Sequence, residues 1–568
     1  MTTPSDVMTP SKLAFEWDAT SSAPKRWRRR LTYTLPGSCA ALLFACLSFT
    51  PSLLPRAALF QGLVTGISAA IGYGLGVACA WVWREFANRQ VREPRRKTWR
   101  AFALIAPIAL VVWVALGQGW QGQLRDLMGL PSQGPSFVLL PLTAALVFVL
   151  VIAAGRGLRG VYRRVTALLG RWIGPRPARA TSVIVVTLGA WLFISGVLLD
   201  GLVWAADQAF AVRNDTTEDG VQEPTSGLRS GGPGSLVPWE SLGRQGRAFT
   251  AGGPSVEEIG AFTGTGAIEP IRIFAGTVSA EDAGERAELA VRDLERAGGF
   301  DRSNLLVVTT TGSGQVLPDS VGAFEYLTAG DSAIVAIQYS YLPSWLSYVV
   351  DQERAREAGR ELFDAVYEQW SALPADDRPR LLVFGESLGS FGGETAFSGE
   401  YDMAKRVDGA LFAGPPNFNT LYREFADDRD DGSPEIEPIF HNGRTVRFAA
   451  RPGREIAPAS QPWNRTRVLY LIHPSDPVVW WSPALLLTRP DWLEEPAGDD
   501  VLDAMVWIPF ITFWQVTADL PLALGAPSGH GHNYSGDHVD GWATVLEPPG
   551  WNAERATELR QIVTADDD

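Results

Sequence analysis

A serine between two glycines is the residue of this sequence best placed to act as a nucleophile. Residues 385–389 read Gly-Glu-Ser-Leu-Gly, with Ser387 at the centre, and they directly follow the apolar run 381–384. Small residues at 391–396 come next and are typical of the first turns of a helix. A strand, a tight turn and a helix in this order raise a serine hydroxyl to the top of a parallel sheet. We therefore predict Ser387 as the nucleophile; a glycine-rich turn with a capping serine is the alternative.

The acid that orients the catalytic histidine should stand just after a strand. Asp476 meets this condition, because the segment 473–477 follows the apolar run 468–472 directly. No clear strand end precedes the later candidates Asp500, Asp503 and Asp519. We predict Asp476 as the acid; a turn-forming aspartate between two prolines is the alternative.

The base should be a histidine that follows this acid in the chain. The chain has five histidines, and only His530, His532 and His538 lie far enough beyond Asp476. We predict His532, because it is nearer to the predicted helix 539–546 and has a tyrosine two places on; His530 is the alternative. A metal site built from this cluster is the less favoured interpretation, because no cysteine accompanies it.

Two backbone N–H groups should stabilise the negative oxygen that forms during attack on an ester. One is predicted to be the amide of Leu388, which directly follows the nucleophile. The other is expected in the loop after the predicted strand 305–310, at Gly312 or Ser313. A plain turn at these two residues is the alternative.

Short apolar runs alternate with amphipathic segments throughout the C-terminal half, which predicts a mostly parallel sheet flanked by helices. The predicted strands are 271–275, 305–310, 333–339, 381–384, 409–412 and 468–472. The clearest predicted helices are 280–297 and 351–371. The fold class is therefore α/β, and about 300 residues suffice for one such core.

Five apolar stretches near the start of the chain are each about long enough to cross a bilayer as a helix. They cover residues 33–54, 57–83, 100–117, 136–154 and 180–204. Glycines recur in the second stretch and favour close contact between helices. No Asp, Glu or His stands at the centre of a stretch, which favours an anchor over a transporter.

Arginine and lysine are concentrated in every second connection. They occur before the first stretch, between the second and third, and between the fourth and fifth, whereas the other two connections offer only Arg56 and Arg125. Positive residues mark the cytoplasmic side of a membrane. Five spans with the N-terminus inside would place the C-terminal domain outside the cytoplasmic membrane. A re-entrant first pair, joined only by residues 51–56, would leave four or fewer spans.

The two parts of the chain differ in charge and in cysteine content. Residues 1–205 carry 22 Lys and Arg against 7 Asp and Glu, whereas the remainder carries 27 against 56. An acidic domain of this kind is not expected to bind nucleic acid. All three cysteines, Cys39, Cys46 and Cys79, lie in the apolar stretches, so the C-terminal domain has neither a disulfide nor a thiolate metal site. No cofactor is indicated.

These features divide the chain into a tail (1–32), a membrane domain (33–205), a linker (206–268) and a catalytic domain (269–568). The linker includes residues 214–234, whose composition predicts a flexible tether or a long loop. The sequence resembles the actinobacterial α/β-hydrolases that have an N-terminal multi-span membrane domain. The resemblance rests on the basic-loop spans, the segment 235–243 (Ser-Leu-Val-Pro-Trp-Glu-Ser-Leu-Gly), the 385–389 turn and the loop 529–534. It implies a hydrolase fold and an envelope location, without implying a substrate.

The expected function is that of a membrane-anchored serine esterase or lipase that acts on envelope lipids through an acyl-enzyme. Transfer of the acyl group to a sugar or lipid hydroxyl, with the same three residues, is one alternative. A non-catalytic envelope scaffold on a hydrolase fold is another. The tryptophan-rich stretch 483–524 could form a lid or acyl-chain wall, or simply core.

Overall fold

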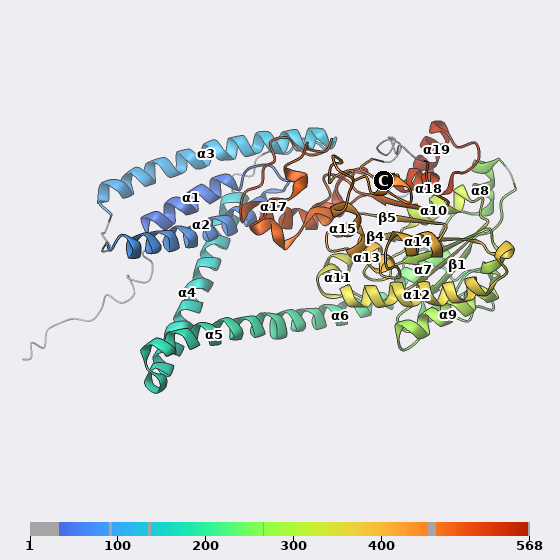
Figure 1. Cartoon of the computed structure of the whole chain (residues 1–568), viewed down its shortest axis with the longest axis horizontal. Coiled ribbons are helices and arrows are strands. Elements are labelled where there is room, and N and C mark those ends of the chain that lie inside the picture. Colours follow the sequence, from blue (N-terminus) through green and yellow to red (C-terminus); the bar gives the residue numbers. More distant parts are fainter. Residues whose placement is uncertain (1–32, 90–93, 135–137, 265, 452–461, 566–568) are drawn as a thin grey trace, which may run out of the picture.

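The computed structural model describes residues 33–89, 94–134, 138–264, 266–451 and 462–565. It consists of long apolar helices in the first third of the chain and a unit built around a sheet that contains the rest (Figure 1). The predicted tail 1–32, the basic residue Arg92 and the start of the predicted fourth span lie outside the described residues.

Within these ranges, the first third folds into six α-helices. They are α1 (Leu35–Leu47), α2 (Ala58–Phe86), α3 (Arg96–Leu127), α4 (Leu139–Ile173), α5 (Pro175–Phe193) and α6 (Asp200–Asn214). A π-helical turn, Ile194–Leu199, joins α5 to α6. Four helices are long and apolar enough to cross a membrane, namely α2, α3, α4 and Pro175–Val197, and they overlap the second to fifth predicted spans.

The prediction of a first span over residues 33–54 is wrong for its second part, residues 48–54, which are not helical. Helix α1 ends at Leu47, and its 13 residues cover only about 20 Å. Residues 48–57, which we call the α1–α2 connection, form a loop that includes Pro51 and Pro55. Prolines end the helix here because their nitrogen has no hydrogen to donate.

The helices run alternately toward and away from the sheet-containing unit. Figure 1 shows that α1, α3 and the α5–α6 rod run toward it, whereas α2 and α4 run away from it. The described basic residues within 84–89, 95–97 and 156–179 therefore gather at the far end of the helices. The two connections poor in basic residues face the sheet-containing unit.

Glycines of α2 let two other helices approach closely, as the glycine pattern predicts. A Cβ atom at Gly62 or Gly66 would come within 2.8 Å of α4 backbone oxygens, and one at Gly72 or Gly76 within 2.6 Å of α1 oxygens. Gly74 faces open space instead. Helix α2 is thus the centre of the packed part of the bundle.

The segment after α6 is a packed loop rather than a flexible tether. Ser230 is buried and donates a hydrogen bond to Asp293 Oδ2 over 2.7 Å. Arg229 pairs with Glu269 at 3.1 Å and also bonds two carbonyl groups of the segment 250–252. The chain therefore enters the sheet-containing unit along a fixed path.

Seven parallel strands form the sheet in the order β1-β3-β2-β4-β5-β7-β6. They are β1 (Ile271–Ala275), β2 (Asn304–Thr309), β3 (Ser332–Ile337), β4 (Arg380–Glu386), β5 (Gly409–Ala413), β6 (Val446–Ala449) and β7 (Arg467–Leu471). Six of these strands agree with predicted strands, so the predicted fold class is confirmed. The edge strand β6 is additional.

Helices cover both faces of the sheet. One face packs against α9 (Ala283–Arg296), α12 (Gln352–Ala372) and α13 (Leu388–Glu394). The other packs against α7 (Gly243–Ala251), α10 (Pro318–Leu327), α18 (Asp537–Leu546) and α19 (Ala553–Val563). Side chains of β2 alternate between the two cores, with Leu305 and Val307 in one and Leu306 and Val308 in the other. Burial on both faces explains why the strands are continuously apolar.

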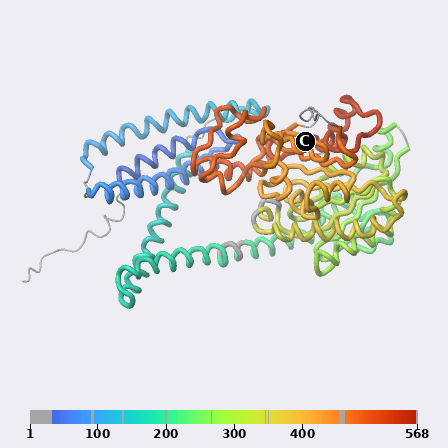
Figure 2. The backbone as a smooth tube through the Cα atoms, viewed as in Figure 1, coloured from blue at the N-terminus to red at the C-terminus, as the bar shows by residue number. Residues whose placement is uncertain are grey.

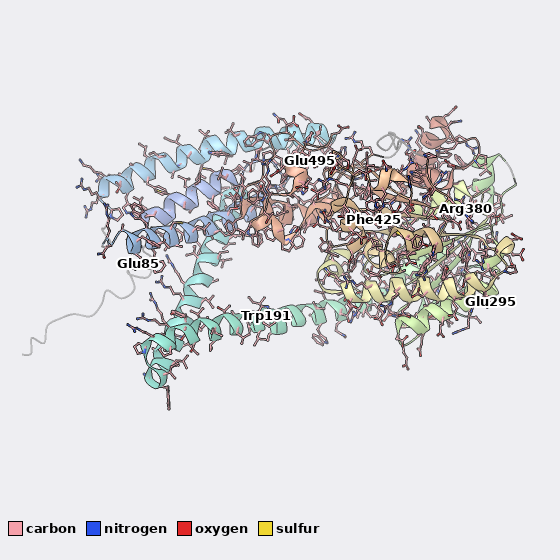
Figure 3. The ribbon with its side chains drawn as sticks, in the orientation of Figure 1. Glu85, Trp191, Glu295, Arg380, Phe425 and Glu495 are labelled. Carbon is pink, nitrogen blue, oxygen red and sulfur yellow. The ribbon has the colours of Figure 1, made fainter. Side chains whose placement is uncertain are left out.

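The carboxyl edge of the sheet faces the membrane helices. Arg380, at the amino end of β4, lies on the side of the unit remote from Glu85 and the α1–α3 bundle (Figure 3). After β7, the chain forms α16 (Pro477–Trp480), α17 (Ile511–Asp519) and the 3-10 turn η9 (Leu520–Gly525). Helix α17 lies against α2, and this orange segment meets the blue helices in Figure 2. Residues that follow the strands thus lie between the sheet and the membrane domain.

Candidate active site

Ser387 stands at a strained turn between β4 and α13. Its φ and ψ angles are 53° and −127°, values that a residue with a side chain rarely adopts. The turn follows a buried strand and leads directly into a helix. This is the geometry of a nucleophile elbow, in which the serine side chain is raised out of the strand–helix junction. Ser387 itself is partly exposed, whereas both of its neighbours are buried.

The two glycines of the 385–389 turn are required by close backbone contacts. A Cβ atom at Gly385 would lie 2.4 Å from the carbonyl oxygen of Gly389. One at Gly389 would lie 2.4 Å from the carbonyl oxygen of Thr309, at the end of β2. The sequence pattern thus reflects a turn that no larger residue could close without displacing the backbone.

The structure brings Asp476 and His532 together. Nδ1 of His532 donates to Oδ2 of Asp476 over 2.7 Å, and both side chains are buried. Burial opposes protonation of His532, but the charge of Asp476, its hydrogen bond and the charge of Glu386 outweigh burial and raise the pKa of His532. A base oriented in this way has its other nitrogen, Nε2, available for a proton.

Asp476 is held by two further donors. The backbone N–H of Val478 bonds Oδ1 at 2.8 Å, because Asp476 caps the first turn of α16. The hydroxyl of Tyr534 bonds Oδ2 at 2.9 Å. The carboxylate is therefore fixed in position before any substrate arrives.

His532 and Ser387 flank the same point of the sheet, the carboxyl end of β5. The backbone N–H of Ser387 donates to the carbonyl of Ala413 over 2.9 Å. The next residue, Gly414, has φ of +52°, and a Cβ atom there would lie 2.4 Å from Cε1 of His532. Nε2 of His532 is buried and has no hydrogen-bond partner among the residues that the structure describes. The nucleophile turn and the base are thus neighbours across one glycine.

The alternative base, His530, belongs to a different pair. Its Nδ1 lies 3.2 Å from Oδ2 of Asp500, which also accepts a hydrogen bond from the hydroxyl of Ser475. That hydroxyl accepts the N–H of Gly531 at 2.8 Å. This arrangement supports the loop that bears His532 and does not bring His530 to Asp476.

His473 also contacts the loop that bears His532. Its Nδ1 lies 2.9 Å from the carbonyl of Gly531, and its Nε2 lies 2.7 Å from Oδ2 of Asp537. Burial opposes its protonation, but these acceptors prevail and raise the pKa of His473. Its ring stacks on Tyr534 with centroids 4.0 Å apart.

A second buried ion cluster lies behind the nucleophile turn. His538 bonds Glu386 through Nε2 at 2.8 Å and Asp319 through Nδ1 at 3.0 Å. Burial disfavours the cation, but the two carboxylates outweigh it and raise the pKa of His538 to about 10. Glu386 directly precedes Ser387, so the cluster fixes the turn from its buried side.

A cavity lies on this side of the base. Its volume is about 880 Å³, and it is lined by Glu386, His532 and His538 together with residues of α10 and α19. Ser387 is not among its lining residues. The cavity is therefore behind the base and does not coincide with the space in front of the nucleophile.

The predicted oxyanion donors have different placements. Leu388 is the first residue of α13, so its N–H lies in the turn where a helix provides no carbonyl partner. Gly312 and Ser313 lie in a tight turn after β2, closed by a bridge between Thr311 and Gln315. The carbonyl of Ser313 accepts a 2.7 Å hydrogen bond from Gln338. Thr309, at the strand end, is the residue that directly abuts the elbow.

Sequence reasoning did not identify the supporting groups around these residues. The roles of His473, Asp500, Asp319 and the Tyr534 hydroxyl depend on contacts between segments far apart in the chain. A tyrosine two places after the predicted base was the one available signal. Among the described residues, no group of three His, Cys, Asp or Glu side chains is arranged to hold a metal ion.

Comparison with known protein families accounts for most of the chain. A profile described as "Alpha/beta-hydrolase family" matches residues 271–559, and one described as "Alpha/beta-hydrolase family N-terminus" matches residues 49–254. Comparison with curated proteins gave no match, and neither did comparison with solved structures. The chain therefore belongs to the alpha/beta-hydrolase family and carries that family's N-terminal domain.

Proposed function

We propose that this protein is a membrane-anchored serine hydrolase that cleaves carboxylic esters through a Ser387–His532–Asp476 triad. The observation that carries the proposal is the 2.7 Å bond from His532 Nδ1 to Asp476, beside a strained Ser387 turn. These three residues occur in the chain order that this fold uses. A serine hydroxyl needs both partners because it is a weak nucleophile on its own.

In the proposed reaction, the Ser387 hydroxyl attacks the ester carbonyl while Nε2 of His532 takes its proton. Asp476 keeps the imidazole in the required tautomer and stabilises the imidazolium that forms. The N–H of Leu388 stabilises the negative oxygen, with a second donor at Gly312 or Ser313. The imidazolium then protonates the leaving alcohol, and water releases the acyl group by the reverse sequence of proton transfers.

The proposed location is the outer face of the cytoplasmic membrane. The basic residues at the far end of the helices favour that end as cytoplasmic, which would place the sheet-containing unit outside. A carboxyl edge that faces the membrane helices favours substrates that reside in or near the bilayer. We therefore propose envelope lipids with acyl esters as the substrate class.

The test uses a fluorophosphonate probe on membranes that contain the full-length protein. Labelling of wild type that disappears in Ser387→Ala and falls at least about a thousandfold in rate in His532→Ala is the expected result. His530→Ala is the matched control and should retain most of the labelling. Labelling that persists in Ser387→Ala, or its absence from well-folded wild type, would contradict the triad and favour a non-catalytic scaffold.

A further inference from the structure

A fully buried ion pair ties the α1–α2 connection to the sheet-containing unit, which we now call the hydrolase unit. Nε of Arg56 lies 3.5 Å from Oδ1 of Asp519 in α17, and neither side chain is exposed. The other oxygen of Asp519 accepts the backbone N–H groups of Leu53 and Leu54 at 3.2 and 3.4 Å. A buried charge without its partner is strongly destabilising, so this carboxylate requires the connection to be in place.

One turn earlier, on the same face of α17, a glutamine also bonds the connection. Nε2 of Gln515 donates to the carbonyl of Thr50 at 2.8 Å and lies 3.0 Å from its hydroxyl. The hydrolase unit therefore satisfies both N–H and carbonyl groups of a membrane-domain loop. Such matched polar contacts distinguish a specific joint from apolar packing alone.

The same connection reaches the loop that carries the proposed base. Leu53 and Leu54 are buried and belong to the hydrophobic core on one face of the sheet. A Cβ atom on Gly531 would lie 3.3 Å from Cδ2 of Leu54. Gly531 directly precedes His532, so a membrane-domain side chain lies against the backbone of the base loop.

The base loop also rests on the turn that follows Asp519. The N–H of His532 donates to the carbonyl of Ala523 in η9 over 3.0 Å. The side-chain amide of Asn533 donates to the carbonyl of Ala526 over 2.9 Å. Helix α17 ends at Asp519 and η9 begins at the next residue. A shift of α17 relative to the α1–α2 connection would therefore also move η9 and, through the bond to Ala523, the backbone of His532.

We infer that the α1–α2 connection is a positioning element of the active site, and that His532 reaches its working geometry only when the hydrolase unit is docked on the membrane domain. The inference rests on the proposed function. Leu54 and Arg56 are positioning residues in this scheme: they hold the base loop and do not touch the substrate. Displacement of a catalytic group by about 1 Å can lower a rate about a hundredfold, so modest loosening of this joint should be measurable.

The experiment compares Leu54→Ala and Arg56→Gln with wild type, all as full-length protein in lipid nanodiscs. Leu294→Ala is the matched control, because Leu294 is a buried leucine of the same hydrophobic core as Leu54 but lies in α9, which packs against α12, β1 and β3. Arg56→Lys is the conservative variant, which keeps the charge opposite Asp519. Three quantities are measured: the fluorophosphonate labelling rate at Ser387, the pH midpoint of that rate, and hydrogen exchange of the peptide 523–534.

We expect Leu54→Ala and Arg56→Gln to slow labelling about tenfold or more and to speed exchange in 523–534. We also expect the pH midpoint to fall, because a displaced His532 loses part of its interaction with Asp476. Arg56→Lys should restore most of the rate, and folded Leu294→Ala should match wild type in all three measurements. A purely structural role of the connection would lower the yield of folded protein without moving the midpoint.

Wild-type rates, midpoints and exchange in Leu54→Ala and Arg56→Gln would overturn the inference, as would equal losses in Leu294→Ala. If Arg56→Gln fails to fold, Leu54→Ala decides the question. If wild type is never labelled at Ser387, the proposed function fails, whereas the exchange data still decide whether the connection holds residues 523–534.

Discussion

The Tyr534 hydroxyl donates a 2.9 Å hydrogen bond to Oδ2 of Asp476, the same oxygen that accepts His532 Nδ1. It also accepts the backbone N–H of His473 at 3.1 Å. One phenol therefore connects the proposed acid to the strand-end segment that precedes it. Its burial, with the charge of Asp476, raises the pKa of Tyr534 well above its ordinary value, so the hydroxyl remains a donor.

Tyr534→Phe should slow fluorophosphonate labelling about tenfold, because Asp476 loses one of its three donors and gains freedom to turn. Tyr470→Phe is a matched control, since Tyr470 is a buried tyrosine that donates to Glu394 at 3.0 Å, away from the triad. Equal effects in the two variants would show that the loss reflects general stability. The measurement is the second-order rate constant of fluorophosphonate labelling, expressed per amount of folded protein.

Gly414→Ala should lower the labelling rate about a hundredfold, because its Cβ atom would occupy the space of the His532 ring. Gly432→Ala is the control, since Gly432 has φ of +87° but open space around it. Both substitutions place alanine in a left-handed conformation, so they share the backbone strain. Only the first should displace the base; comparable rates in both would argue against contact between Gly414 and His532.

The labelling rate should rise with pH through a midpoint above 6.5, because the base must be neutral and the pKa of His532 is raised from that value. The charge of Glu386 is one of the causes of this rise. Glu386→Gln should therefore move the midpoint to lower pH, and a rate profile over pH 5 to 9 measures it. An unchanged midpoint would show that the charge of Glu386 does not affect the pKa of His532.

The His538 cluster should make stability fall at high pH. Since the pKa of His538 is raised to about 10 in the folded protein, its stabilising effect is complete below its ordinary value of 6.5 and is lost as pH rises through 10. The difference in melting temperature between wild type and His538→Gln should thus be largest near pH 6 and shrink toward pH 10. His441→Gln, at an exposed histidine, should change the melting temperature little. If the difference in melting temperature instead grew with pH, His538 would not be protonated in the folded protein.

The sequence predicted those features that depend on local pattern and left out those that depend on distant contacts. The apolar runs identified β1–β5 and β7, because strands buried on both faces have few polar residues. Strand β6 was missed: its four residues, Val446–Ala449, include Arg447 and are ordered by pairing with β7. The elbow was predictable because two glycines and a serine must occur together there.

The partners of the triad were predictable only in part. The predicted strand end singled out Asp476, and chain order limited the base to three histidines. Nothing in the sequence predicted that Asp500 also has a histidine partner, His530. The end of α1 at Leu47 was missed for a related reason. The predicted first span included residues 48–54, yet Leu53 and Leu54 pack into the hydrolase core instead.

The Arg56–Asp519 joint also has a consequence for biosynthesis. Leu53 and Asp519, which the joint unites, are 466 residues apart, so a ribosome needs on the order of a minute to make the second half after the first. During that time the membrane helices can already be inserted, while Arg56 lacks its partner because Asp519 has not yet been synthesised. Assembly of the joint would therefore be among the last events of folding, and a chain truncated before residue 519 could not complete it.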